Sequence, residues 1–189
     1  STVTSFLLAF SMEYNIQDSI DLKDSSTYKS FTDRYFSKRY ILNFDGIQNN
    51  DIMLMFHSNR ITLICLAPSH FFFKKNDKYR LNFTIGKVDR LSNSVKGKGK
   101  KGGQTLYPQS VICKVEWSDS TSFVVPCGMK GTLIEVNDQL VSSPEYLREQ
   151  PDSDGFIAIM LSSITTSDAT KNKLLTHEEY LKIMNNSKM

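Results

Sequence analysis

Three glycines, Gly97, Gly99 and Gly102, are spaced as G-x-G-x-x-G within the stretch VKGKGKKGGQTL (95–106). In a dinucleotide-binding site this spacing follows a strand and opens a helix whose N-terminus faces the pyrophosphate. Here the approach reads LSNSV and the exit reads QTLYPQS, in which Pro108 and β-favouring residues disfavour a helix. We therefore expect a turn between strands rather than a nucleotide site. A Walker-type loop is excluded as well, because no G-K-[ST] follows at the required spacing.

The same stretch is dense in lysine. Lys96, Lys98, Lys100 and Lys101 fall within six positions, and such a cluster can contact phosphate groups or an acidic protein surface. A solvated loop whose charges are spread in water explains the pattern equally well. The stretch lacks aromatic residues until Tyr107, which weighs against single-stranded nucleic acid, where bases stack on aromatic rings.

The nucleophilic and metal-ligating residues form no catalytic or metal-binding pattern. His57 and Ser58 are adjacent in a predicted hairpin and point to opposite faces, so they are poorly placed as base and nucleophile. The cysteines, Cys65, Cys113 and Cys127, show no C-x-x-C spacing, and the histidines do not lie near them at a spacing typical of metal ligands. The sequence therefore excludes a zinc site. Two of the cysteines lie in apolar runs, as buried reduced thiols do. We therefore predict a non-enzymatic protein without a metal or other cofactor.

The bulk composition is typical of one soluble globular core. The chain has 189 residues, of which 40% are hydrophobic and 23% charged. The net charge of +3 is too small to indicate a nucleic-acid binder by itself. The apolar run SFLLAF is too short to span a membrane, so we expect no membrane partner. We predict a tail or added segment over residues 1–30 and a single domain over 31–189.

The apolar runs predict a mostly β domain. IMLMF and ITLICLA are joined by HSNR (57–60), a polar group typical of a tight hairpin turn. Short runs rich in Val, Ile, Leu and Phe follow and predict further strands: YRLNFTIGKV, SVICKVEW, SFVVPC, GTLIEV and FIAIML. Before them, FTDRYFSKRY (31–40) mixes aromatic and basic residues, which is typical of an amphipathic helix or a docking surface.

Two short helices are predicted late in the chain. Ser143 followed by Pro144 and Glu145 has the order of an N-cap, a first-turn proline and a first-turn acid, so PEYLREQ is expected to be helical until Pro151. Thr176 and Glu179 form the pattern of a capping box and predict a C-terminal helix over 176–186 that docks on the barrel. Its spacing directs one set of side chains to a common face: Leu175, Tyr180, Leu181 and Met184.

The run GTLIEVNDQLVSSPEYLREQPDSDGFIAIML resembles the C-terminal half of the glycine cleavage system H-protein family. That family has a strand of type G-x-V-x-E-V-N, a short helix at P-E-L and a strand of type G-W-L-I-x-I. The matching residues are Gly131, Glu135, Val136, Asn137, Pro144, Glu145, Gly155 and Ile157. The resemblance implies a lipoyl/biotinyl-carrier-like fold, a flattened barrel-sandwich of two small sheets with short peripheral helices.

A carrier of that family attaches lipoic acid to a lysine at the tip of the hairpin before the G-x-V-x-E-V-N strand. The corresponding hairpin here is VEWSDSTSFVV, whose tip consists of Ser118, Asp119, Ser120 and Thr121. Lys114 and Lys130 flank the hairpin and do not crown it. The chain therefore lacks the anchor for an amide-linked arm at this position.

The blocks FTDRYFSKRY, HSNRITLICLAPSH and VKGKGKKGGQTL, together with the H-protein-like run, resemble the Abitram (Simiate) family, the actin-binding transcription modulators of animals and other eukaryotes. The resemblance runs from about Phe31 to Met184. It implies a non-enzymatic protein of the nucleus and cytoplasm, associated with actin filament dynamics, nuclear speckles and transcription.

We therefore hypothesise a protein-interaction module that binds actin or another protein with an acidic surface, possible partners including nuclear transcription or RNA-processing factors. The basic residues expected to contact the partner are Lys96, Lys98, Lys100, Lys101, Arg34, Lys38 and Arg39. Tyr35, Phe36 and Tyr40 either cover one edge of the barrel as part of an appended helix or, if exposed, act as hot spots. The alternatives are a nuclear nucleic-acid-associated factor using the basic loop, a structural subunit of a larger assembly, and a carrier modified at another lysine.

Overall fold

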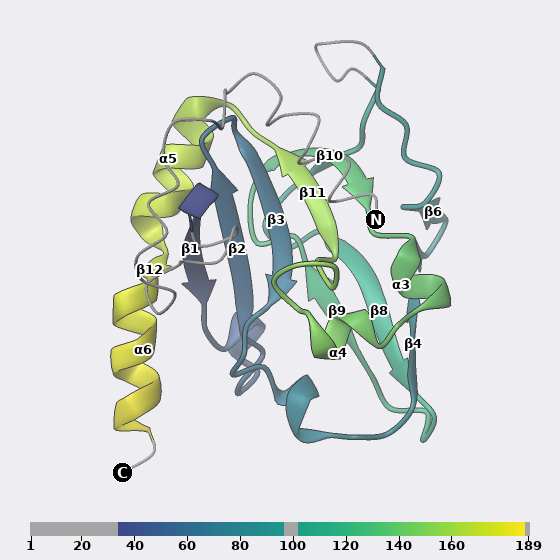
Figure 1. Cartoon of the computed structure of the whole chain (residues 1–189). Helices are drawn as coiled ribbons and strands as arrows, with labels where there is room; N and C mark the ends of the chain where they lie inside the picture. The colour runs from purple at the N-terminus through teal and green to yellow at the C-terminus, as the bar shows by residue number, and fades with distance from the viewer. Residues whose placement is uncertain (1–33, 97–101, 188–189) are drawn as a thin grey trace, which may run out of the picture.

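The computed structural model describes residues 34–96 and 102–187 and consists mainly of two packed antiparallel sheets (Figure 1). The larger sheet has the order β12-β1-β2-β3-β11-β10-β7 and the smaller has the order β4-β8-β9. Strands of the larger sheet are β1 (Phe36–Ile41), β2 (Ile52–His57), β3 (Ile61–Leu66), β7 (Thr105–Leu106), β10 (Gly131–Val136), β11 (Ala158–Leu161) and β12 (Leu175–Thr176). Those of the smaller sheet are β4 (Tyr79–Asn82), β8 (Val111–Trp117) and β9 (Ser122–Pro126).

The remaining elements are short and lie at the periphery. A two-residue pair of strands, β5 (Thr84–Ile85) and β6 (Val88–Asp89), forms a separate hairpin. The helical elements are η1 (Phe44–Gly46), η2 (Phe71–Lys74), α3 (Gln139–Ser142), α4 (Tyr146–Glu149), α5 (Ile164–Lys173) and α6 (His177–Asn186). The expected mostly β barrel-sandwich with short peripheral helices and a C-terminal helix is confirmed. Within the described residues, no helix is long and apolar enough to cross a membrane.

The β2–β3 hairpin is apolar on both faces because both faces are buried. Leu54 and Ile64 belong to the core between the two sheets, whereas Met55 and Cys65 belong to a second cluster on the opposite face. The predicted turn is confirmed and is closed by Arg60, whose φ of 73° lies in the left-handed region. Burial on both faces explains why this hairpin shows continuous apolar runs instead of alternation.

Of the two interpretations of FTDRYFSKRY, an amphipathic helix or a docking surface, the helix is wrong for the residues after Tyr35, and residues 31–33 lie outside the described residues. From Phe36 onward the segment is strand β1, which pairs with β2 on one side and β12 on the other. Phe36, Lys38 and Tyr40 share one face of the strand, and both aromatic residues are buried. The lysine is accommodated on this face because its Nζ lies 3.2 Å from Asp152 Oδ2.

Helix α6 begins as its sequence predicts and is fixed against β1. Thr176 caps it reciprocally with Glu179, which confirms the capping box. The Tyr180 ring stacks on Tyr40 with centroids 3.9 Å apart, and its hydroxyl accepts the Ser69 N–H at 3.1 Å. Leu181 was expected on the same face, but it is 44% exposed and lies outside the buried face. Figure 1 shows α5, β12 and α6 running along the β1 edge of the larger sheet.

The H-protein-like run also folds as its motifs predict, with one difference at the helix. Helix α4 covers Tyr146–Glu149, and its N-cap is Glu145 rather than Ser143. Buried Asn137 holds the following turn, because its Nδ2 donates to the carbonyls of Asp154 at 2.7 Å and Phe156 at 2.8 Å. The motif asparagine thereby joins the end of β10 to the approach of β11.

The three cysteines are spread through the core. Cys65, Cys113 and Cys127 all lie within the described residues and are buried, unpaired thiols. Burial raises the pKa of each thiol, that of Cys127 to about 11. The prediction of buried reduced thiols is confirmed for all three.

Candidate functional site

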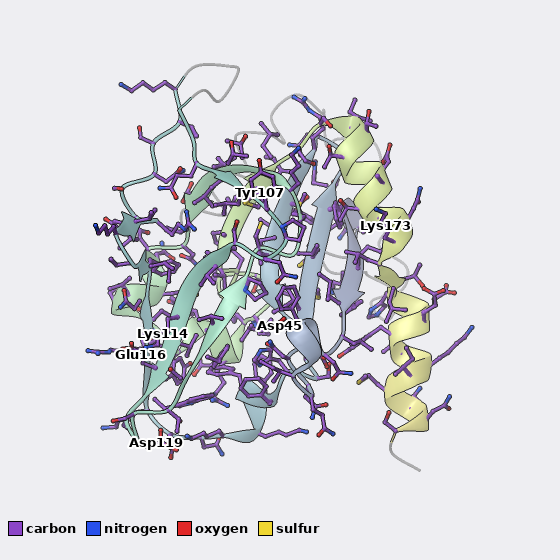
Figure 2. The ribbon with its side chains drawn as sticks, turned by 180° about the vertical axis from the view of Figure 1, so that it is seen from behind. Asp45, Tyr107, Lys114, Glu116, Asp119 and Lys173 are labelled. Carbon is purple, nitrogen blue, oxygen red and sulfur yellow. The ribbon has the colours of Figure 1, made fainter. Side chains whose placement is uncertain are left out.

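The candidate site is the tip of the β8–β9 hairpin together with the outer face of the smaller sheet. Near the tip the two strands pair with Glu116 opposite Ser122 and Lys114 opposite Val124, and the register shifts farther along, between Val111 and Cys113. Residues 118–121 form the exposed turn, which confirms the predicted hairpin. Figure 2 shows Asp119 at the far end of the hairpin, with Lys114 and Glu116 farther along the same strand pair.

The turn is built from its own side chains. Asp119 Oδ1 accepts the backbone N–H of Thr121 at 2.9 Å and the Thr121 hydroxyl at 2.5 Å. Ser120 adopts a φ of 70°, the left-handed conformation that closes the loop. The Ser118 N–H donates to the carbonyl of Lys78 at 2.8 Å, which ties the tip to the start of β4. The tip is thus a defined surface loop.

A lysine from another segment meets this tip. Lys75, which follows η2, forms an ion pair with Asp119 and donates to the Thr121 hydroxyl at 2.8 Å. Its ammonium also lies 4.5 Å from the centroid of the Trp117 ring, within the range of a cation–π contact. The tip carboxylate is therefore engaged by a cation that is distant in the sequence.

The chemistry available at the tip follows from this pairing. The hydrogen bonds from Lys75 and Thr121 hold the pKa of Asp119 well below its usual range, and the carboxylate raises the pKa of Lys75. The tip therefore presents hydroxyl groups and a carboxylate that is compensated by Lys75.

Above the tip, the outer face of the smaller sheet carries a charged cluster. Arg80 on β4 lies opposite Glu116 on β8, and the guanidinium donates to Glu116 Oε2 at 2.8 and 2.9 Å. Lys114 Nζ lies 3.0 Å from the other carboxylate oxygen. These two cations lower the pKa of Glu116. A shallow groove of about 560 Å³ passes over this cluster and reaches Lys78 and the tip serines.

Two of the predicted contact residues on β1 have partners inside the fold. The Lys38 side chain is 14% exposed and pairs with Asp152. Arg39 Nε donates to the carbonyl of Lys171 at 3.2 Å, which ties β1 to the end of α5. Both side chains therefore hold peripheral segments against the sheet.

The aromatic residues expected beside them separate into core and surface. Phe36 is 7% exposed and packs edge-on against His57, with ring centroids 5.2 Å apart. Tyr35 is 49% exposed and stacks on the same imidazole at 6.4 Å. Phe36 and Tyr40 thus take the core position that was one of the two alternatives. Arg34 and Tyr35 are exposed and come directly before the strand.

Three of the four lysines of the lysine-rich stretch, Lys98, Lys100 and Lys101, lie outside the described residues. Lys96 is described and exposed. The flanks of the stretch are well anchored, since Gln104 N–H donates to Asn93 Oδ1 at 2.8 Å. Gly102 has a φ of 92°, and strand β7 rather than a helix follows it. The expected turn without a nucleotide-binding helix is confirmed on this side.

Lys75, Lys78 and Arg80 were missed by sequence reasoning. They lie in and before the strand YRLN, where alternating basic residues are ordinary for a solvated face. Only the pairing of β4 with β8 brings them to the hairpin. Among the described residues, no three His, Cys, Asp or Glu side chains come together in a group that could hold a metal ion.

Comparison with known proteins places the chain in a family. The family model described as glycine cleavage H-protein matches residues 66–187. Protein Abitram from Drosophila melanogaster is 40% identical over 153 residues, covering 81% of this chain and 69% of the fly protein. The chain belongs to the Abitram family. Protein Abitram from Danio rerio is 35% identical and covers 86% of this chain and 93% of the fish protein. The human Abitram protein is 34% identical, covering 82% of this chain and 87% of its own length.

A solved structure of an H protein also aligns with part of this chain. The glycine cleavage system H protein from Mycobacterium marinum aligns with a TM-score of 0.48 and 16% identity, over 71% of this chain and 91% of that one. The H-protein family match includes the whole β8–β9 hairpin and both late helices. This member of the Abitram family therefore combines an H-protein domain with a hairpin tip that lacks lysine.

Proposed function

We propose that this chain is a non-enzymatic protein-interaction module that binds actin and acts in the nucleus and cytoplasm, in association with transcription. The observation that carries the proposal is the hairpin tip. The H-protein hairpin is kept, but its tip reads Ser-Asp-Ser-Thr and its carboxylate is held by Lys75. A carrier scaffold whose attachment point is replaced by a surface ion pair has its exposed faces available for partners.

An acidic partner fits the distribution of basic residues. Lys96 is exposed, and Lys98, Lys100 and Lys101 follow it in the chain. Arg34 is exposed and lies two residues before β1. Actin carries acidic surface, and complementary charge accelerates association and fixes orientation. Lys38 pairs with Asp152, and Arg39 donates to the Lys171 carbonyl. Both side chains therefore support this surface more than they contact a partner directly.

Co-sedimentation with filamentous actin tests the proposal. We expect the wild-type chain to enter the pellet with actin, and we expect less of it there when Lys96, Lys98, Lys100 and Lys101 are all changed to glutamate. Thermal melting of the variant checks that the fold is intact. A wild-type chain that stays in the supernatant at all actin concentrations contradicts actin binding. Equal pelleting of the two chains contradicts the role of the lysine loop.

The density of lysine in the loop supports a second candidate, a nuclear factor that binds nucleic acid phosphates. Such binding weakens steeply with added salt, because each phosphate contact releases counterions. Titration of a single-stranded oligonucleotide at several salt concentrations separates this candidate from the first. A flat response to salt, or binding that survives the quadruple glutamate change, counts against it.

Mass spectrometry of the intact chain tests the remaining alternative, a carrier modified at another lysine. A measured mass equal to the mass calculated from the sequence would exclude it.

A further inference from the structure

The outer face of the β4–β8–β9 sheet is exposed along its whole width. Alternate residues of its strands point outward and are solvent-accessible, while the residues between them are buried in the inter-sheet core. The groove of about 560 Å³ crosses all three strands and ends at the hairpin tip. In Figure 2 the labelled Lys114, Glu116 and Asp119 follow one another towards that tip.

The groove is basic. It is lined by three cations, Lys78, Arg80 and Lys114, and by one carboxylate, Glu116. The Arg80 side chain is 81% exposed and the Lys114 side chain 42%, whereas the Glu116 side chain is 19% exposed beneath them. Both cations bond to the same carboxylate, so they leave a net positive charge facing solvent. Beside the tip, Lys75 pairs with both Asp119 and Asp77, so these three groups together leave a negative charge there that is smaller than the positive charge of the groove lining.

The spacing of the cations matches an extended chain. Arg80 lies opposite Glu116, and Lys114 lies two residues along β8 from that position. Such diagonal neighbours on one sheet face are about 7–8 Å apart. Lys78 precedes Arg80 by two residues, a step of about 7 Å along a strand. Carboxylates on alternate residues of an extended peptide are also separated by about 7 Å, so three of them can meet the three cations in order.

The surroundings favour carboxylates over nucleic acid. The aromatic residues at the groove are Trp117, which is 7% exposed, and Tyr79, whose hydroxyl donates to the carbonyl of Pro144 at 2.9 Å. Their rings are therefore poorly placed to stack on bases, which is how proteins hold single strands. The exposed hydroxyls of Ser118, Ser120 and Ser122 can donate to carboxylate oxygens. A guanidinium also binds a carboxylate through two parallel hydrogen bonds.

We infer that the groove over Lys78, Arg80 and Lys114 is a docking site for an extended acidic segment of a protein partner, with Asp or Glu at alternate positions. The inference rests on the proposed function, because it assigns a second surface that an acidic partner such as actin would meet, in addition to the exposed Lys96 and Arg34. This second surface lies on the smaller sheet.

Fluorescence anisotropy tests the inference with a labelled twelve-residue peptide in which Asp or Glu alternates with Ser. We expect the wild-type chain to bind it and the Lys78→Glu/Arg80→Glu variant to bind roughly tenfold more weakly or worse, since two attractive charges become repulsive. Lys173→Glu/Lys182→Glu is the matched control, because it makes the same change in net charge on exposed residues of α5 and α6. We expect it to bind as the wild type does.

Three results in the binding assay would overturn the inference: no binding of the peptide to the wild-type chain, an equal loss in the control, or tighter binding of a labelled single-stranded DNA of equal charge. Thermal melting and the neutral variant Lys78→Gln/Arg80→Gln separate lost charge from lost folding, and the neutral variant is expected to show an intermediate affinity. Actin co-sedimentation of the same variants keeps the two proposals apart. If Lys78→Glu/Arg80→Glu still pellets with actin, the groove assignment fails and actin binding stands. If the wild type does not pellet, actin binding fails and the peptide result still decides the groove.

Discussion

A buried histidine should make this fold sensitive to mild acid. His70 is 1% exposed and caps η2, where its Nδ1 accepts the backbone N–H of Phe72 at 3.0 Å. The ring proton therefore lies on Nε2, which donates to Asn50 Oδ1 at 3.1 Å. A second proton would have to enter at Nδ1, facing an N–H donor. Burial lowers the pKa of His70 from 6.5 to about 3.

The sign and size of the effect follow from this difference. Because the folded pKa is depressed, the unfolded chain binds a proton below pH 6.5 that the folded chain refuses, so stability is full above 6.5 and falls as the pH drops towards 3. Each pH unit within that window costs about 1.4 kcal/mol. Between pH 7.5 and pH 5 the free energy of unfolding should fall by about 2 kcal/mol through this one group.

Urea unfolding at a series of pH values measures this loss in the wild type and in His70→Asn. Asparagine keeps an acceptor for the Phe72 N–H but does not titrate, so the variant should be less stable at pH 7.5 and lack this part of the pH dependence. Carboxylates with shifted pKa, such as half-buried Glu135, contribute equally to both chains and cancel in the difference. If the two chains lose the same stability between pH 7.5 and 5, the assignment of the acid sensitivity to His70 is refuted.

Three further substitutions test the described packing by urea or thermal unfolding. Asn137→Ala removes two hydrogen bonds to backbone carbonyls and should lower the free energy of unfolding by about 1–3 kcal/mol. Asn137→Asp should not restore the stability, because a carboxylate cannot donate to those carbonyls. A loss below about 0.5 kcal/mol in the alanine variant would contradict the role of Asn137 in holding the turn. Gly155→Ala would place a Cβ 2.7 Å from the carbonyl oxygen of Gln150, so we expect the free energy of unfolding to fall by about 3 kcal/mol. Gly86→Ala, with open space around it, should lower it by only about 1 kcal/mol. Equal losses in the two variants would contradict this reasoning. Thr176→Ala removes the cap of α6 and should cost about 1 kcal/mol, with Thr176→Ser near wild type, and a harmless alanine would argue against the capping box.

The parts of the fold that the sequence predicted are those in which local pattern and tertiary position agree. The β2–β3 hairpin, the strand that ends in Asn137 and the cap of α6 all have strong local signals, and all three occur. Helix α5 was missed because it is polar around its circumference, so its sequence ITTSDATKNK has no apolar stripe to detect. Its start depends on the Ser163 side chain, which accepts the Thr166 N–H at 3.1 Å.

Strand β1 was mistaken for a helix for a physical reason. Phe36 and Tyr40 are four residues apart, a spacing that suits one face of a helix, and the strand alternation between them is broken by Lys38. Lysine occupies the inward position only because Asp152, 114 residues away, neutralises it. Such a partner cannot be read from the local sequence. The same holds for the candidate site, where the tip residues were found but Lys75 and Arg80 were not.

The place of β12 and α6 at the outer edge of β1 bears on how the chain folds during synthesis. Tyr40 donates to or accepts from His177 across 137 residues, at 2.9 Å. At a translation rate of about 5–20 residues per second, β1 waits roughly 7–27 s on the ribosome before its edge partner is made. During that time its backbone edge is open to pairing with other chains. Nascent chains stalled before Leu174 should therefore be prone to aggregation, and a chaperone that shields strand edges should bind them in preference to the finished protein.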